Sequence, residues 1–309
     1  MRVTGYFLLD DWQSLLAGRH LWILLGSILV AIALCLTVRI TGPGMIRVED
    51  ELEAAVEKGE LVILWGLIRA EMFRGPEEAV QLVHCWLLCW GLGPVGILLC
   101  LACTAGAIPG FLQSGSSILV FTSPVSRCSI ALYKHLAIVL FMSVLAAGFS
   151  LGTAVSLALV TGYWPGSGLA AVGVFAIALA AFLGFSLLLG AVTRSQAAAL
   201  VGNVLFWLVC YAANVSHWQG MAEHLPHVFS PAIASWPYWC LPKPADLLVL
   251  LDKLSGGSGH FASLPEVLAI ASGAAFNPWW SVTTSLAFGL ATTLLAGWEL
   301  QSTEPGISS

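Results

Sequence analysis

The chain has 309 residues, of which 58% are hydrophobic and only 9% are charged, and its formal net charge is −5. A soluble domain carries about 25% charged residues, because these side chains cover the surface that faces water. Together with a mean hydropathy of +0.89, this composition excludes soluble globular, disordered and nucleic-acid-binding proteins. Long unbroken apolar runs, in place of short alternating segments, predict an all-α integral membrane protein and not a β-barrel.

The first element expected along the chain is a helix that lies in the membrane interface. Residues 4–20 carry apolar side chains at roughly helical spacing, and polar side chains fill the opposite side. This pattern predicts an N-terminal interfacial helix that leads into the first membrane span.

Six stretches are long and apolar enough to cross about 30 Å of hydrocarbon, which takes roughly 20 residues. They are residues 21–38, 82–108, 136–160, 169–192, 197–215 and 280–300. Among Asp, Glu, Lys and Arg, only Glu299 lies inside these stretches, at the end of the last one. The fourth stretch also places small residues three or four positions apart, which favours close helix packing within the chain over a dimer contact. These small residues are Gly173, Ala176, Ala180 and Gly184.

Basic residues in the short links predict the orientation of the six spans. One face of the membrane receives five basic and four acidic residues, and the other receives seven basic and thirteen acidic residues. The basic residues of the first face are Arg2, Arg19, Arg127, Lys134 and Arg194. The positive-inside rule therefore predicts a multi-pass protein of the cytoplasmic (inner or plasma) membrane with both termini in the cytoplasm.

Two long loops, residues 39–81 and 216–279, are expected on the outer side. The first is acidic and is predicted to form helices over residues 48–58 and 60–73, before the Gly75-Pro76 break. Its carboxylates alternate with apolar residues and lack calcium-loop spacing, which favours a soluble acidic cap over a cation site. The second loop contains five prolines between Pro226 and Pro244, which exclude one continuous helix but allow a short helix over residues 246–254.

Two motifs for chemistry within the chain are missing. The dipeptide Gly-Lys does not occur, so the chain has no P-loop for ATP, and the H-E-x-x-H motif is absent too. The spacings C-x-x-C, at Cys100 and Cys103, and G-x-S-x-G, around Ser150, do occur, but both lie inside predicted membrane spans. We therefore expect no catalytic, cofactor-binding or metal-binding residues and no enzymatic activity. Cys85 and Cys89, one helical turn apart, suit helix packing better than a disulfide. A copper path through the thiols, or a metal site at His217, His224 and His227, is an alternative without motif support.

The nearly uncharged spans also separate the possible transport mechanisms. Ion-coupled transporters place ionisable side chains at mid-membrane depth, and channels need charged rings or a carbonyl filter. The six stretches show neither pattern. A transport role would therefore need energy supplied by another polypeptide.

A cytoplasmic segment, residues 111–135, joins the second and third spans. It contains Gly115-Ser116-Ser117-Ile118-Leu119-Val120, then Ser123-Pro124-Val125-Ser126-Arg127, and finally Leu132-Tyr133-Lys134. In sequence and position it resembles the segment that joins spans two and three of ABC-2 type ABC transporter permeases. The six spans and the interfacial helix are also similar to those of nitrous-oxide-reductase maturation and gliding-motility permeases.

The resemblance implies a single ABC-2 type transmembrane domain over residues 1–309 and a six-span transport subunit, expected to be an exporter. Residues 111–135 would be the coupling helix that docks on a separate ABC ATP-binding subunit. The residues that carry this coupling would be Gly115, Ser123, Pro124, Val125, Arg127 and Lys134. ATP and Mg²⁺ would bind only in that partner, and two permease chains would form a homodimer or a heterodimer.

Two other functions stay open at this point. The chain would be a non-transporting membrane scaffold or assembly factor if its acidic outer loops served only to recruit a partner. It would be an energy-independent channel or a secondary carrier if transport needed no ATP. A neighbouring reading frame with a Walker A sequence in the same operon would favour the ABC transporter.

Overall fold

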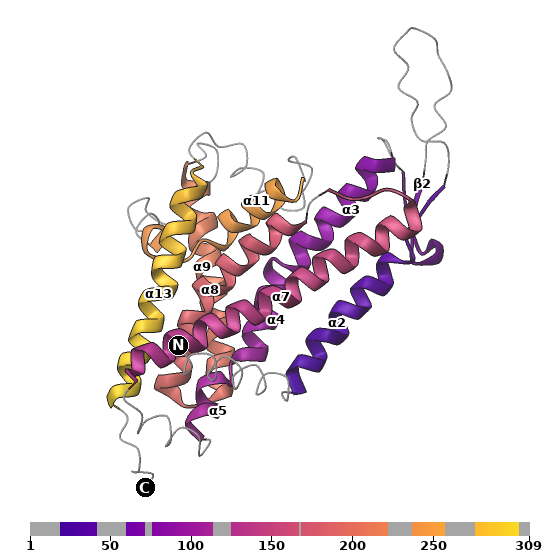
Figure 1. Ribbon diagram of the computed structural model, residues 1–309. Helices are drawn as coiled ribbons and strands as arrows, with labels where there is room; N and C mark the ends of the chain where they lie inside the picture. Colours follow the sequence, from indigo (N-terminus) through magenta and orange to yellow (C-terminus); the bar gives the residue numbers. More distant parts are fainter. Residues whose placement is uncertain are drawn as a thin grey trace.

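The computed structural model describes residues 19–41, 60–71, 76–113, 125–166, 168–221, 237–256 and 276–302, and these are mostly helical (Figure 1). The interfacial helix predicted over residues 4–20 lies almost entirely outside the described residues, and so does the helix predicted over residues 48–58. Of the predicted coupling residues, Gly115, Ser123 and Pro124 also lie outside them.

The described helices run back and forth along the length of the molecule (Figure 1). In chain order they are α2 (Arg19–Cys35), α3 (Pro76–Gly91), α4 (Pro94–Thr104), α5 (Ala107–Gln113), α7 (Arg127–Thr161), α8 (Leu169–Thr193), α9 (Gln196–Met221) and α13 (Pro278–Ser302). Helices α3, α4 and α5 follow one another in a single pass. As a result, the beginning of α2 and the end of α13 lie at the same end of the molecule (Figure 1). We call this end, which also holds Arg127, Lys134 and Arg194, the basic end.

Four passes are long and apolar enough to cross a membrane: Pro76–Leu112, Arg127–Thr161, Leu169–Thr193 and Gln196–Trp218. They correspond to the second to fifth predicted spans. The first predicted span is a shorter apolar helix, Leu21–Cys35. The last, α13, has 25 residues but seven of them are Ser or Thr, which lower its mean hydropathy. The six-span topology therefore stays a prediction. The helices nevertheless follow one another in the order predicted for the six spans, and successive passes alternate in direction as predicted (Figure 1).

The second pass is broken where one continuous span was expected. Helix α3 ends at Gly91, and α4 begins at Pro94, which lacks the backbone N–H that a continuing helix would need. A Cβ atom on Gly93 would lie 2.0 Å from the carbonyl oxygen of Cys89, so only glycine fits this bend. An apolar cavity of about 240 Å³ lies beside the bend, lined by residues that include Leu24 of α2, Trp90 of α3 and Phe149 of α7.

Residues 60–73 were expected to form a helix, and the structure corrects this prediction. Strands β2 (Glu60–Ile63) and β3 (Ile68–Glu71) pair antiparallel around the short 3₁₀ helix η1 (Leu64–Gly66), and β1 (Arg39–Thr41) pairs with the other edge of β2. The sheet order is β1-β2-β3. Gly66 has a φ of 102°, a left-handed conformation that suits glycine in the turn. The run Leu61-Val62-Ile63 favours a strand through its β-branched side chains, which the acidic composition obscured.

Helix α8 lies at the centre of the bundle, where it contacts α4, α5, α7, α9, α11 (Pro244–Leu254) and α13. Its closest neighbour is α13, because glycines let the two backbones touch. A Cβ atom on Gly184 would lie 2.1 Å from the carbonyl oxygen of Gly289, and one on Gly289 would lie 2.5 Å from that of Ala180. The small residues Ala180 and Gly184 therefore serve packing within the chain, as the sequence predicts.

We predict that Gly184→Ala lowers the stability of the bundle by about 1–3 kcal/mol, because the added methyl group must push α13 away from α8. Gly173 is the matched control, since it lies on the same helix and a Cβ atom there would have no atom within 4 Å. Gly173→Ala is expected to leave stability unchanged or to raise it by about 0.5–1 kcal/mol. Thermal unfolding of the detergent-solubilised protein measures both. Equal melting temperatures for the two variants would contradict the proposed backbone contact.

Candidate functional site

Two of the predicted coupling residues lie in the first turns of α7, at the basic end. Helix α7 begins at Arg127, and the preceding residue, Ser126, is its N-cap. The Ser126 hydroxyl accepts a hydrogen bond from the backbone N–H of Ser129 (3.2 Å). Residues 127–135 of the predicted coupling helix are thus the start of the 35-residue helix α7 and not a separate element. Arg127 is therefore continuous with the rest of α7 through helical backbone.

Side-chain contacts tie this start of α7 to its neighbours. The guanidinium of Arg127 donates a hydrogen bond to the carbonyl oxygen of Leu300 at the end of α13. The ammonium of Lys134 lies 4.5 Å from the centroid of the Phe111 ring, on α5, in a cation–π contact. The end of α5, the start of α7 and the end of α13 are therefore joined to one another, and in the chain residues 114–124 connect the first of these helices to the second.

The backbones of α7 and α13 also touch at this end. A Cβ atom on Gly297 would lie 2.5 Å from the Cα atom of Cys128. Nearby, Arg194 links α8 to α9 in a left-handed conformation (φ 52°), and its N–H donates to the carbonyl oxygen of Gly190 (3.1 Å). Four of the five basic residues that the sequence assigns to one membrane face, Arg19, Arg127, Lys134 and Arg194, thus lie at one end of the bundle, and Arg2 lies outside the described residues.

The opposite end is organised by Asp246, a fully buried residue in the first turn of α11. One carboxylate oxygen, Oδ1, accepts hydrogen bonds from the side chains of Asn214 (2.9 Å) and Trp218 (2.7 Å), both on α9. The other, Oδ2, accepts from the hydroxyls of Tyr238 (3.0 Å) and of Ser281 on α13 (2.6 Å). Four donors from three segments therefore hold a single carboxylate.

Asn214 completes the attachment of α11. Its side-chain oxygen accepts hydrogen bonds from the backbone N–H groups of Ala245 (2.9 Å) and Asp246 (3.1 Å), which the first turn of a helix leaves without partners. The Asn214 side chain thus caps α11 from another helix while it binds the Asp246 carboxylate.

Lys243 is buried beside this network. Its ammonium donates to the hydroxyl of Thr284 and lies 4.7 Å from the centroid of the Tyr238 ring, and its backbone N–H donates to the hydroxyl of Ser285 (3.2 Å). Burial lowers the pKa of Lys243, and the negative charge of Asp246 acts in the opposite direction. These contacts fix the chain just before α11 to the start of α13.

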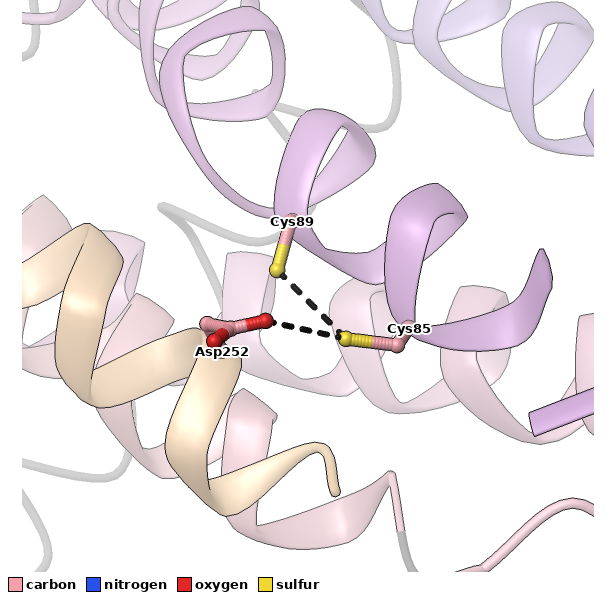
Figure 2. A group of neighbouring side chains, drawn as sticks. All are labelled: Cys85, Cys89 and Asp252. Atoms are coloured by element: carbon pink, nitrogen blue, oxygen red, sulfur yellow. Dashed lines mark hydrogen bonds between the residues drawn. The ribbon is translucent and has the colours of Figure 1, made fainter. Parts of the chain in front are cut away.

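The other end of α11 meets α3 at a cluster of two thiols and a carboxylate (Figure 2). The Cys85 thiol donates to Oδ1 of Asp252 (3.4 Å), and its sulfur lies 3.9 Å from that of Cys89. All three residues are buried, and their ligand atoms lie within 4.8 Å of one another. Cys85 and Cys89 share one face of α3, as the sequence predicts, but they face a carboxylate as well as apolar neighbours.

The short helix that the sequence allows over residues 246–254 is present as α11, but sequence reasoning missed its buried ionisable groups because it assigned residues 216–279 to a loop outside the bilayer. Helix α11 instead packs against α3, α8, α9 and α13. A signal was present in the sequence of α11, which apart from Lys253 and its two aspartates contains only proline, alanine, leucine and valine. So apolar a helix needs cover on more than one side, and its carboxylates then need partners inside the protein.

Comparisons with models of protein families, with curated proteins and with solved structures gave no match. The resemblance to ABC-2 type permeases therefore stands on the motifs of residues 111–135 and on the predicted span order.

We predict that Asp246→Ala destabilises the protein by about 3–5 kcal/mol, because four buried donors lose their acceptor at once. Asp246→Asn keeps the shape and one acceptor oxygen, so its loss of stability should be smaller. Glu77→Gln is the control, since Glu77 is an exposed carboxylate at the start of α3. Melting temperatures from tryptophan fluorescence in detergent give the ranking. An Asp246→Ala protein as stable as the Glu77→Gln protein would rule out a supporting role for this network.

Proposed function

We propose that the chain is the permease subunit of an ABC transporter. In this proposal it exports an unidentified substrate across the cytoplasmic membrane with energy from ATP that a separate subunit hydrolyses. The observation that carries the proposal is that Arg127 and Lys134 join the start of α7 to the ends of α13 and α5, because α5 and α7 are the two helices that residues 114–124 connect in the chain. A protein docked on that segment would act on three membrane helices at once.

The rigidity of α7 supports this transmission of force. The helix runs unbroken for 35 residues, from the basic end to the far end, where Leu157 packs with Cys35 and Val38. An α-helix of that length spans about 50 Å, at 1.5 Å per residue. A tilt imposed at Arg127 would therefore reach the opposite side of the membrane. The ATP-binding subunits can drive this tilt of α7, because ATP binding favours one arrangement of the two ATP-binding subunits over the other.

The partners in this proposal are two ABC ATP-binding subunits and a second permease chain, either identical or related. ATP and Mg²⁺ belong to the partner, so no catalytic role is assigned to this chain. The permease would lie in the cytoplasmic membrane with both termini in the cytoplasm, in agreement with the presence of Arg127, Lys134 and Arg194 at the end of the bundle where α13 ends.

A secondary carrier is the second candidate, because the described part of the bundle buries one lysine and two aspartates at the end opposite the basic end: Lys243, Asp246 and Asp252. A proton-coupled or ion-coupled carrier would have to bind and release a proton or another ion at one of these side chains during each transport cycle. Asp246 accepts four hydrogen bonds, which suits a fixed structural carboxylate better than one that exchanges protons. Transport that continues without ATP and stops in Asp246→Asn would favour the carrier.

We predict that a membrane-impermeant maleimide labels Cys240 in intact cells and labels Cys128 only after the membrane is opened. Cys240 is exposed near α11, and Cys128 lies at the start of α7, at the basic end. The variants Cys240→Ser and Cys128→Ser identify the labelled residue. Labelling of Cys128 from outside would reverse the proposed orientation and with it the docking side of the ATPase.

We predict that replacing Ser123, Pro124 and Val125 by glycines uncouples the ATPase. The permease-stimulated rate of ATP hydrolysis in proteoliposomes should fall about tenfold or more, equivalent to about 1.4 kcal/mol of activation free energy. Pull-down of the ATP-binding subunit shows whether docking itself persists.

Trp164→Gly is the control for this substitution, since Trp164 is exposed in the link between α7 and α8 at the opposite end. It should keep the full stimulated rate. A triple-glycine variant with an unchanged stimulated rate would show that residues 123–125 do not couple the two subunits.

A further inference from the structure

The geometry of Cys85, Cys89 and Asp252 matches the ligands of a tetrahedral metal ion (Figure 2). With metal–sulfur bonds of about 2.3 Å and a metal–oxygen bond of about 2.1 Å, tetrahedral angles separate two sulfurs by about 3.8 Å and a sulfur from an oxygen by about 3.6 Å. The corresponding distances here are 3.9 Å between the sulfurs and 3.4 Å between Cys85 Sγ and Asp252 Oδ1. The third distance, between Cys89 Sγ and the Asp252 carboxylate, is within 4.8 Å, so side-chain rotations that shorten it would let one ion contact all three atoms.

The two elements that supply these ligands are held together by other contacts. One turn before Cys85 on α3, the side-chain amide of Gln81 donates a hydrogen bond to the carbonyl oxygen of Gly256 (3.3 Å), just beyond the end of α11. The first turn of α11 is fixed separately through Asp246. The protein thus positions the three ligand atoms without an ion, which reduces the ordering cost of binding one.

The kind of ligand atoms selects the class of metal. Calcium and magnesium require oxygen ligands, whereas two sulfurs and one oxygen suit borderline and soft divalent ions such as Zn²⁺, Co²⁺ and Cd²⁺. A bound dication would also compensate the charge of the buried Asp252 carboxylate more strongly than a thiol does, because a thiol is a weak hydrogen-bond donor. Three protein ligands leave one coordination position for water or another donor.

We propose that Cys85, Cys89 and Asp252 bind one divalent ion of the zinc class, which clips α11 to the outer part of α3. On binding, each thiol loses its proton to solvent and the resulting thiolate forms a bond to the metal, so two protons are released per ion. The site departs from the sequence-based expectation that the chain holds no metal, and it does not depend on the proposed transport function.

Titration of the full-length protein in detergent with Co²⁺ or Cd²⁺ tests this site. The protein is first treated with a chelator, and Cys128→Ser and Cys240→Ser remove a partly exposed and an exposed thiol outside the cluster. We expect thiolate-to-metal charge-transfer absorption that saturates at one ion per chain and is displaced by Zn²⁺. Cys89→Ser and Asp252→Asn should weaken binding by at least about 100-fold. Cys100→Ser, a buried thiol on α4 outside the cluster, should bind like the parent protein.

A second readout needs no substitution in the cluster and so covers variants that fail to fold. Zn²⁺ should protect Cys85 and Cys89 of the unmodified protein from a membrane-permeant alkylating reagent, while Cys100 and Cys103 react at the same rate with and without the ion. Mass spectrometry of the peptides locates the label. Absence of both charge-transfer absorption and protection, or equal binding in Cys89→Ser, would overturn the proposal. A chain that binds the ion but does not stimulate an ATPase would leave the site intact and reject only the proposed function.

Discussion

The contact between the backbones of α8 and α13 determines where the two ends of the molecule lie relative to each other. In lipid, helices gain little from the hydrophobic effect, so close packing and hydrogen bonds must hold them together. Gly184 and Gly289 bring the two helices into backbone contact near the middle of α13. From there, α13 extends to Ser281 in the Asp246 network at one end and to Leu300 beside Arg127 at the other. The contact between these two glycines therefore helps to position Ser281 in the Asp246 network and Leu300 beside Arg127, at opposite ends of the bundle.

The end opposite the basic end obeys a second constraint, that buried polar groups need partners inside the protein. Asp246 meets it with four donors, and Lys243 with Thr284 and the Tyr238 ring. Because these partners come from α9, α13 and the chain before α11, they fix α11 in one position. This fixed position in turn brings Asp252 to the thiols of α3, so the two buried carboxylates of α11 belong to one arrangement.

Much of the helical framework could be predicted from the sequence, because long apolar runs are a local signal. The predicted boundaries of the fourth span, 169–192, differ from those of α8 by one residue. The hairpin over residues 60–71 was missed because acidic composition outweighed the β-branched run. The break after Gly91 was missed as well, although Gly93-Pro94 marked it, because hydropathy alone does not detect a bend.

The candidate sites depend on contacts between distant residues, which a single sequence does not reveal. Asp246 and Asn214 are 32 positions apart, and Asp252 and Cys85 are 167 apart. The loop that contains both aspartates is rich in proline and glycine, which suggested exposure to water. At the basic end the situation was different, since Arg127 and Lys134 lie in one short motif and were found from the chain itself, whereas their partners Leu300 and Phe111 were not.

The bend between α3 and α4 gives the second pass a joint with free volume next to it. Trp90 lines the cavity of about 240 Å³ on one side and a second cavity of about 150 Å³ towards α9 and α11. A helix bordered by such voids can change its angle without breaking dense packing on those sides, because few dispersion contacts are lost. The half of the pass before the bend is α3, which carries Cys85 and Cys89. The half after the bend is α4, which leads to α5 and to Phe111, the residue that contacts Lys134. The pass therefore contains a hinge between two helical segments. The segment before the hinge, α3, contacts α11, and α5, which follows α4 after the hinge, contacts α7.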